Sequence, residues 1–278
     1  MKHLFDELSY TVSKIATQKY STSFSIGIFA LKPSIRNAIY AIYGYVRLAD
    51  EIVDSFHDYD KSKLLTRLRI ETENALNEGI SLNPILQSFQ ETVHQYNIDR
   101  QLIAQFLHSM EMDLNKMDYN SELYNEYIYG SAEVVGLMCL QVFTEGNREK
   151  YGELKPFAKK LGSAFQKINF LRDLKDDYHL LGRTYFPNLD MRIFDNYAKC
   201  QIENEIEQEF KEALIGIKKL PKSSMFGVYL AYRYYLHLFY KIKRKSSNDI
   251  LSSRVRIPDA QKMVVAFQSY LRYKMTML

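Results

Sequence analysis

The chain has 278 residues, of which 46% are hydrophobic and 25% are charged, and its formal net charge is +4. This length and apolar content allow one large buried core, and the small net charge is not typical of a nucleic-acid-binding protein. Two cysteines are too few for a disulfide framework, and no run of about 18 apolar residues is present to cross a membrane. We therefore expect a protein of the reducing cytoplasm that binds no nucleic acid.

The hydrophobic pattern is helical almost throughout the chain. Apolar residues recur at helical spacing in the segments 64–76, 102–110 and 202–217. Turn-forming residues separate the helical segments near positions 32–33, 77–84, 144–147, 182–188 and 220–224. Neither a fixed-period repeat nor a long linker divides the sequence, so we expect residues 1–278 to form a single all-α domain.

Two segments each carry a pair of aspartates four residues apart, namely Asp50 and Asp54, and Asp173 and Asp177. Residues at i and i+4 share one helix face, and like charges so placed cost roughly a few tenths of a kcal/mol. A cation held between the two pairs would offset this repulsion. Because carboxylates with arginines beside them are typical of Mg²⁺ and phosphate groups, the pairs predict a magnesium–diphosphate site.

A polar stripe leads into the second pair. Gln166 and Asn169 precede Asp173 and Asp177 at steps of three, four and four residues, so all four lie on one face of an otherwise apolar helix. Such a stripe is equally typical of a solvated surface. The order from amides to carboxylates favours a site, and the loop that follows carries Arg183, which could fold back over it.

Five collinear segments resemble the phytoene/squalene synthase family, the head-to-head prenyltransferases of the isoprenoid synthase fold. These segments are residues 20–25, 47–54, 127–136, 161–187 and 254–262. The fourth is the most specific, because it fills every fixed position of the family's second signature. The family implies a helical bundle around a central active-site cavity. Glu133 and Ile128 stand where the family has smaller residues, and we expect altered packing or pocket shape there.

The resemblance implies a role for each matching residue. The residues implied as both metal ligands and catalytic groups are Asp50, Asp54, Asp173 and Asp177, and further catalytic groups are Tyr127 and Tyr235. The residues implied to bind substrate are Tyr20, Ser21, Phe24, Tyr43, Arg47, Gln166, Asn169, Arg172, Arg183 and Arg254. Taken by themselves, the two arginines beside the aspartates could be plain salt-bridge partners, and the tyrosines could be ordinary core residues.

The activity that the resemblance implies is a head-to-head condensation of two geranylgeranyl diphosphates to phytoene, in carotenoid biosynthesis. It implies Mg²⁺, with Mn²⁺ as an alternative, and a cyclopropylcarbinyl diphosphate intermediate, and NADPH is not expected. A C15 enzyme that makes dehydrosqualene or squalene is the alternative, although Gly27 and Ile28 beside Phe24 slightly favour the longer chain. A non-catalytic assembly factor is less consistent with four retained aspartates. A terpene cyclase or head-to-tail synthase would carry a different second motif.

The expected partner is the prenyl diphosphate substrate, and no oligomeric state is predicted. The expected location is the cytoplasm, with peripheral association with the inner face of the membrane for product release as a second expectation. A basic run at residues 241–245 bears on this point. Its simpler interpretation is a solvated helix end, and the alternative is contact with anionic lipid.

Overall fold

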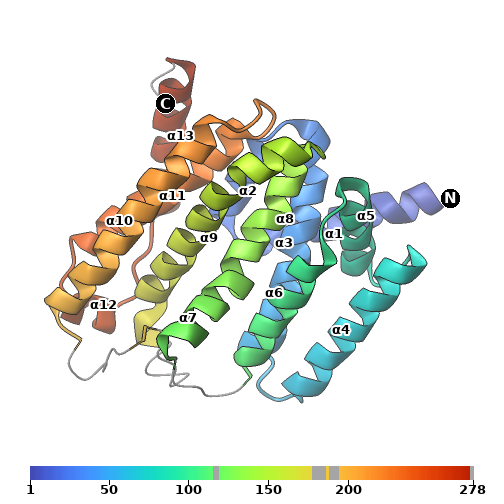
Figure 1. The fold of residues 1–278 in the computed structure, drawn as a ribbon, viewed down its shortest axis with the longest axis horizontal. Coiled ribbons are helices and arrows are strands. Elements are labelled where there is room, and N and C mark those ends of the chain that lie inside the picture. Colours follow the sequence, from blue (N-terminus) through green and yellow to red (C-terminus); the bar gives the residue numbers. More distant parts are fainter. Residues whose placement is uncertain (115–118, 177–185, 188–193, 276–278) are drawn as a thin grey trace.

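The computed structural model describes residues 1–114, 119–176, 186–187 and 194–275, and within these ranges it contains helices and connecting turns but no strand. The helices in chain order are α1 (Lys2–Tyr20), α2 (Thr22–Phe29), α3 (Pro33–Asp54), α4 (Lys61–Glu78), α5 (Pro84–Tyr96), α6 (Arg100–Met112), α7 (Ser121–Ile128), the π-helical turn η1 (Tyr129–Glu133), α8 (Val134–Phe143), α9 (Arg148–Asp176), α10 (Asn196–Lys218), α11 (Met225–Lys243), α12 (Ser247–Ser252) and α13 (Asp259–Lys274). The prediction of an all-α fold is confirmed. In Figure 1, α10 and α4 lie at opposite edges of the molecule, with α9, α8 and α6 between them.

Local capping sets the helix boundaries at the predicted breaks. α3 begins at Pro33, whose fixed φ suits the first helical turn. The Asn83 side chain accepts a hydrogen bond from a backbone N–H in the first turn of α5. Gly79 caps the C-terminus of α4 with a φ of 72°, in the left-handed region that glycine adopts without strain. The predicted breaks at 144–147 and 220–224 also fall between helices.

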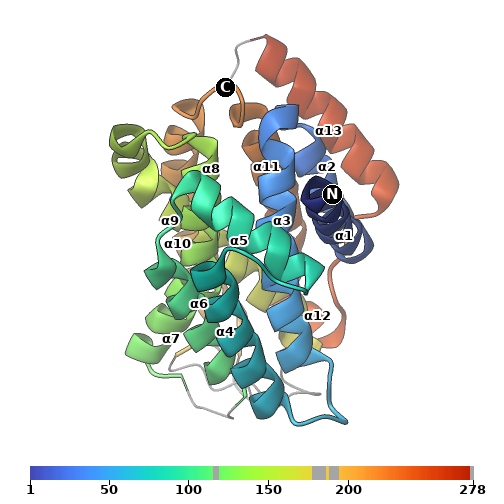
Figure 2. The ribbon, with the colours of Figure 1, turned by 90° about the vertical axis from the view of Figure 1, so that its right-hand side faces the viewer.

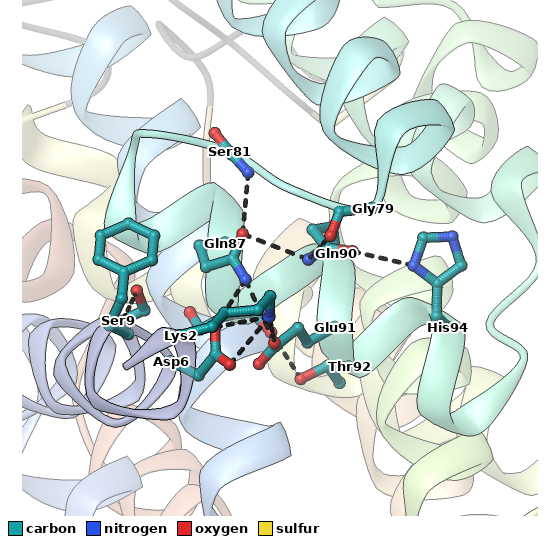
Figure 3. A network of polar contacts seen from close by, with 12 residues as sticks. Lys2, Asp6, Ser9, Gly79, Ser81, Gln87, Gln90, Glu91, Thr92 and His94 are labelled. Carbon is teal, nitrogen blue, oxygen red and sulfur yellow. Dashed lines mark hydrogen bonds and ion pairs between the residues drawn. The ribbon is translucent and has the colours of Figure 1, made fainter.

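A polar network fastens α1 to α5 (Figure 3). The Lys2 ammonium lies 2.8 Å from Asp6 and 2.9 Å from Glu91. The Gln87 amide donates to Asp6 at 2.9 Å and accepts a hydrogen bond from the Ser81 backbone N–H at 2.8 Å. Because these ion pairs and hydrogen bonds connect α1 with α5, they hold the start of α1 in place. The far end of α1 supplies the first residue of the site described below.

A second ionic group fixes α9 against α10. The Lys167 side chain is only 4% exposed and pairs with Glu209 at 2.9 Å and with Glu205. The Ser163 hydroxyl donates to Glu209 at 2.9 Å, and burial raises the pKa of that carboxyl. Removing one member would leave a buried charge without its partner, which is costly in a protein interior. The cluster therefore sets the position of α9, the helix that carries the second aspartate segment.

The single turn of π-helix joins α7 to α8 at a point where α6 approaches closely. A Cβ on Gly130 would lie 2.7 Å from the Ser109 Cβ, so only glycine fits there. Turns of this kind are frequent at functional sites because they shift the register of the helix that follows. Ile128 is buried, and Glu133 forms an ion pair with Lys159 of α9 at 2.9 Å. The unusual glutamate is thus accommodated by a partner on the neighbouring helix.

Candidate active site

The first wall of the site is the second half of α3. Asp50 and Asp54 both line a cavity, as the i,i+4 spacing predicts. The Arg47 guanidinium lies 4.0 Å from Asp50, pairs with Glu51, and stacks 4.3 Å from the centre of the Tyr20 ring. Arg47 is therefore held among an aromatic face and two acidic groups and borders the same cavity.

The second wall is the last part of α9. The Arg172 guanidinium donates from Nε to Asp173 at 2.9 Å, and Arg254, from the segment before α13, lies 2.7 Å from the same carboxylate. The Tyr235 hydroxyl of α11 donates to the Asn169 side-chain oxygen at 3.3 Å. The three described members of the predicted polar stripe, Gln166, Asn169 and Asp173, thus line the cavity, and two of them contact other elements, so they are not part of a plain solvated surface. The two remaining predicted site residues, Asp177 and Arg183, lie outside the described residues.

The cavity between these walls has a volume of about 870 Å³. Every predicted site residue that the structure describes lines it, namely Tyr20, Ser21, Phe24, Tyr43, Arg47, Asp50, Asp54, Tyr127, Gln166, Asn169, Arg172, Asp173, Tyr235 and Arg254. Residues from helices far apart in the sequence therefore meet around one space. Their placement around one cavity agrees with the predicted site.

The cavity has two chemically different ends. The polar end is lined by Arg47, Asp50, Asp54, Asp113, Asn169, Arg172, Asp173 and Arg254. The apolar end is lined by Leu31, Ile39, Leu140, Phe143, Leu154, Phe157 and Leu220. Along α3, Ile39 precedes Asp50 by eleven residues, or about 17 Å at 1.5 Å per residue, and along α9 Phe157 precedes Asp173 by sixteen residues, or about 24 Å. The cavity is thus long enough to hold a charged head and an extended hydrocarbon tail.

Aromatic rings surround the middle of the cavity. Phe165 and Tyr235 are stacked with ring centres 3.8 Å apart. Phe24 lies 5.6 Å from Tyr43 and 5.9 Å from Tyr235, measured between ring centres. Burial raises the pKa of Tyr43 to about 12 and also raises the pKa of Tyr235, so both hydroxyls stay protonated at neutral pH. These rings present neutral, electron-rich faces, which attract positive charge.

Asp113, at the end of α6, is a polar lining residue that the sequence analysis missed. It accepts a hydrogen bond from the Tyr127 hydroxyl at 2.7 Å in a buried setting. No motif marks it, because a single acidic residue at a helix end is common on protein surfaces. The only signal in the sequence is its position directly after the apolar face of α6, which includes Met110.

The polar end concentrates negative charge in a confined space. Burial, together with the nearby charges of Asp54 and Asp113 and against the opposing charge of Arg47, raises the pKa of Asp50 to about 7. The Asp50 side chain borders the cavity and is 33% exposed. A cation placed there would relieve the repulsion. The raised pKa of Asp50 is consistent with the repulsion between aspartates that their i,i+4 spacing predicts.

The donor set of the polar end suits a hard divalent cation. Among the described residues, no three histidine, cysteine or acidic side chains gather closely enough to form a metal site by themselves. Mg²⁺ usually takes only one or two protein carboxylates and completes its shell with water and substrate phosphate oxygens. The carboxylates of Asp50 and Asp54 on α3, and of Asp173 on α9, fit that mode.

Comparison with known proteins agrees with this geometry. A family model described as squalene/phytoene synthase matches residues 17–261, so the chain belongs to the squalene/phytoene synthase family, a family of prenyltransferases. Phytoene synthase of Arthrospira platensis is 26% identical over 95% of this chain and 93% of its own length. The chloroplastic phytoene synthase 1 of Solanum lycopersicum is 27% identical over 91% of this chain, which spans 66% of that longer protein.

Solved structures show the same fold at lower identity. A dehydrosqualene synthase in complex with a ligand has a TM-score of 0.82 and 19% identity, covering 97% of this chain and 98% of its own. Squalene synthase HpnC from Alicyclobacillus acidocaldarius has a TM-score of 0.73 and 20% identity, covering 85% and 93%. Both confirm the expected isoprenoid synthase fold. No helix among the described residues is both long and apolar enough to cross a membrane.

Proposed function

We propose that this enzyme condenses two molecules of geranylgeranyl diphosphate head to head to form phytoene. The observation that carries the proposal is the single cavity with facing acidic and cationic groups at one end and an apolar lining at the other. Two allylic diphosphates require both features, because their heads are anionic and their tails are hydrocarbon. In the first step one substrate loses diphosphate and its allylic carbon joins a double bond of the second, giving a cyclopropylcarbinyl diphosphate.

The overall reaction balances without a redox partner. Two carbon–oxygen bonds break and two diphosphates leave, one from each substrate. One proton leaves as the cyclopropane forms, and a second leaves when the rearranged cation is quenched to an alkene. A hydride donor such as NADPH would be needed only if that last cation were reduced instead, as in the formation of squalene. We therefore propose that this enzyme works without NADPH.

The polar end would hold the diphosphates. Asp50, Asp54 and Asp173, with Asp177 from the sequence, would bind Mg²⁺ or Mn²⁺, which neutralises charge that develops on the departing oxygens. Arg47, Arg172 and Arg254 would donate charge-assisted hydrogen bonds to the same oxygens. Such bonds are roughly twice as strong as neutral ones. The arginines that pair with carboxylates in this structure would then bridge the two walls through the substrate.

The aromatic middle of the cavity would protect the cationic intermediates. Phe24, Phe165 and Tyr235 present their rings between the polar and the apolar end. Ring faces attract cations most strongly where water is excluded. Because burial keeps the Tyr43 hydroxyl protonated, it offers no strong nucleophile to trap the cation. Tyr127, oriented by Asp113, would fix the position of the substrate at the boundary of the polar end.

The choice of a C20 substrate rests on the relatives. The similar curated proteins from Arthrospira platensis and Solanum lycopersicum are both named phytoene synthases. Gly27 and Gly227 border the cavity where α2 meets α11, and they let the two helices pack closely, because a Cβ on Gly227 would lie 2.7 Å from the Gly27 carbonyl oxygen. A C15 substrate is the second candidate, because the dehydrosqualene synthase structure has a TM-score of 0.82 to this chain.

Incubation with defined substrates tests the proposal. Purified protein receives Mg²⁺ and either the C15 or the C20 diphosphate, with and without NADPH, and the hydrocarbons are extracted and identified by mass spectrometry. We expect phytoene from the C20 substrate, unchanged by NADPH, and no hydrocarbon when a chelator removes the metal. Dehydrosqualene or squalene as the main product would favour the C15 alternative. No hydrocarbon from either substrate would contradict the assignment of an enzyme.

A further inference from the structure

The outward face of α13 carries a stripe of exposed apolar side chains. Its members are between 42% and 64% exposed, namely Met263, Val264, Phe267, Tyr270, Leu271 and Met275. Their spacing along the chain is that of one face of a helix. Single exposed apolar residues are ordinary, whereas a continuous stripe on one helix is typical of a surface that contacts another apolar phase.

The opposite face of α13 holds the helix to the rest of the protein. Val265 is buried against Leu230 and Tyr234 of α11, with Ile26 of α2 packed beside them. The Tyr234 hydroxyl also donates to the Lys262 carbonyl at 3.0 Å. Figure 2 shows α13 on the outside of the bundle, next to α2 and α11. The apolar stripe is thus the exposed side of α13, with one ring contact to the bundle, between Tyr270 and Phe226 of α11 at 5.9 Å.

Positive charge accompanies the stripe. From Met225 to Leu278 the sequence has ten lysines and arginines but only two acidic residues, although the whole chain has a net charge of only +4. Within α13 the single acidic residue is Asp259, at the first position, whereas Arg272 and Lys274 are exposed in the last turn. One end of the stripe is thus strongly cationic.

Two further lysines lie at this cationic end. The ring of Phe226, in the first turn of α11, packs 5.0 Å from the Tyr273 ring, which places the α10–α11 corner and its exposed Lys222 beside the last turn of α13. At the same corner, the backbone N–H of Lys32, whose side chain is exposed, donates to the Ser223 carbonyl at 2.8 Å. Cations from three elements therefore gather at the end of one apolar stripe.

Two cations of the basic run at residues 241–245, Lys241 and Lys243, are engaged within the protein. The Lys241 ammonium donates to the Arg256 carbonyl at 2.6 Å. Lys243 pairs with Glu207 of α10 at 2.7 Å. These two side chains stabilise the end of α11, whereas α13 has exposed cations beside an exposed apolar face.

We propose that α13 docks this enzyme on the surface of a membrane that contains anionic lipids. Phe267 and Leu271 would enter the boundary between head groups and acyl chains, and Arg272 and Lys274 would contact lipid phosphates. A helix with an apolar face bordered by Lys and Arg lies in the plane of such an interface. Each cation near an anionic surface strengthens binding by a few-fold, which corresponds to about 1 kcal/mol.

Docking at α13 would also place one wall of the cavity beside the bilayer. The helices that hold α13, α2 and α11, line the cavity through Gly27, Gly227 and Ala231. This step rests on the proposed function, since only a hydrocarbon product needs a lipid phase to receive it. Vesicle binding itself requires no catalysis, so its failure would count against the docking surface and leave the proposed reaction untouched.

A single introduced tryptophan tests insertion directly, because the chain contains none. In Phe267→Trp, we expect the fluorescence emission to shift to shorter wavelength when vesicles of phosphatidylcholine and phosphatidylglycerol are added. Tyr197→Trp is the matched control, because Tyr197 is an aromatic residue 72% exposed on α10, away from the stripe. No shift at position 267, or equal shifts at both positions, would overturn the proposal.

Vesicle flotation measures the contributions of the stripe and the charges. We expect Phe267→Ser/Leu271→Ser to weaken binding by about tenfold or more, since two inserted side chains are lost. Ile70→Ser/Leu82→Ser removes two apolar residues that are 52% and 92% exposed elsewhere, and we expect it to bind like the wild type. Arg272→Gln/Lys274→Gln should reduce binding to the anionic vesicles by about tenfold and leave the weak binding to pure phosphatidylcholine unchanged.

Two results would contradict membrane docking. One is that the wild type binds neither kind of vesicle, or that it binds equally well with and without phosphatidylglycerol. The other is a lipid-free wild-type dimer that Phe267→Ser/Leu271→Ser converts to a monomer in sedimentation analysis, because a second copy of the chain would then cover the stripe. Circular dichroism of each variant confirms that the helical fold is retained.

Discussion

The polar end of the cavity gathers groups that repel one another, whereas the apolar end is lined by side chains that also form the core. At the polar end, burial and neighbouring charge raise the pKa of Asp50 to about 7. At the apolar end, Leu31, Ile39, Leu140 and Leu154 are each less than 7% exposed. One end is therefore arranged for a charged ligand at some cost in stability, and the other contributes to stability itself. Changes at the two ends should have separable effects.

The largest effect is expected from Asp50→Asn. This change keeps the size of the side chain but removes a charge from the polar end, so metal and diphosphate binding should weaken together. We expect hydrocarbon formation to fall by about 10³-fold in steady-state assays, the scale of removing a central electrostatic group. Raising the Mg²⁺ concentration should recover only part of this loss.

The control for that variant is Asp58→Asn, the same chemical change at an exposed position in the turn after α3. It should leave turnover unchanged. If Asp50→Asn retained near-normal turnover, or if both variants lost activity equally, the assignment of Asp50 to the metal site would be wrong.

A smaller loss is expected from Arg254→Gln. Arg254 lies 2.7 Å from Asp173 and is 39% exposed, so it can turn toward a bound diphosphate. Loss of one charge-assisted hydrogen bond should lower kcat/KM by about 10–100-fold. Arg256→Gln is the matched control, because Arg256 contributes only its backbone carbonyl to a contact with Lys241. Equal effects of the two variants would indicate a general loss of charge and not a contact with substrate.

The polar end could be predicted from the sequence because helix periodicity alone places its residues. The i,i+4 spacing puts Asp50 and Asp54 on one face, and the steps of three and four align Gln166, Asn169 and Asp173. Each of these lies at the cavity in the structure. The spacing did not predict that the two segments, which lie more than 100 residues apart, share one site. That prediction came from the resemblance to a family.

The remaining parts depend on tertiary packing, which local patterns do not record. Asp113 reaches the cavity only because α6 packs against the π-helical turn, where Gly130 permits close approach. The residues of the apolar end carry the same helical pattern as the core residues around them, so periodicity cannot separate lining from core. In the sequence, the apolar stripe of α13 cannot be distinguished from a face that packs on the core. The structure shows that Val265 faces the core and that the stripe is exposed.

At the apolar end, Cys139→Phe should change the preferred chain length more than the chemistry. Cys139 lines the cavity on α8, and burial raises the pKa of its thiol to about 12, so it is an inert lining group. A bulky ring there shortens the space for a tail. We expect the ratio of C20 to C15 turnover in a competition assay to fall by about tenfold.

The chain offers a matched control in its other cysteine, Cys200, which is exposed on α10. Cys200→Phe should leave the ratio unchanged. If Cys139→Phe lowered turnover of both substrates equally, the added ring would be disturbing the fold or the polar end, and thermal unfolding would distinguish the two. In either case the separate control of chain length by the apolar end would be contradicted.

The smallest expected effect is the pH dependence that Asp50 contributes to the stability of the metal-free protein. A carboxyl whose pKa is raised in the folded state binds its proton more tightly there than in the unfolded chain, where the value is about 3.9. The stability it contributes is present at low pH and is lost as the pH rises from about 4 toward about 7. The wild type should therefore lose about 2–4 °C in Tm over this range relative to Asp50→Asn, which cannot titrate there.

Cys139→Phe should keep the wild-type slope of Tm against pH, because the apolar end adds no group that titrates in this range. Added Mg²⁺ should flatten the slope of the wild type by favouring the ionised carboxylate, and a slope that Asp50→Asn leaves unchanged would show that the repulsion lies elsewhere.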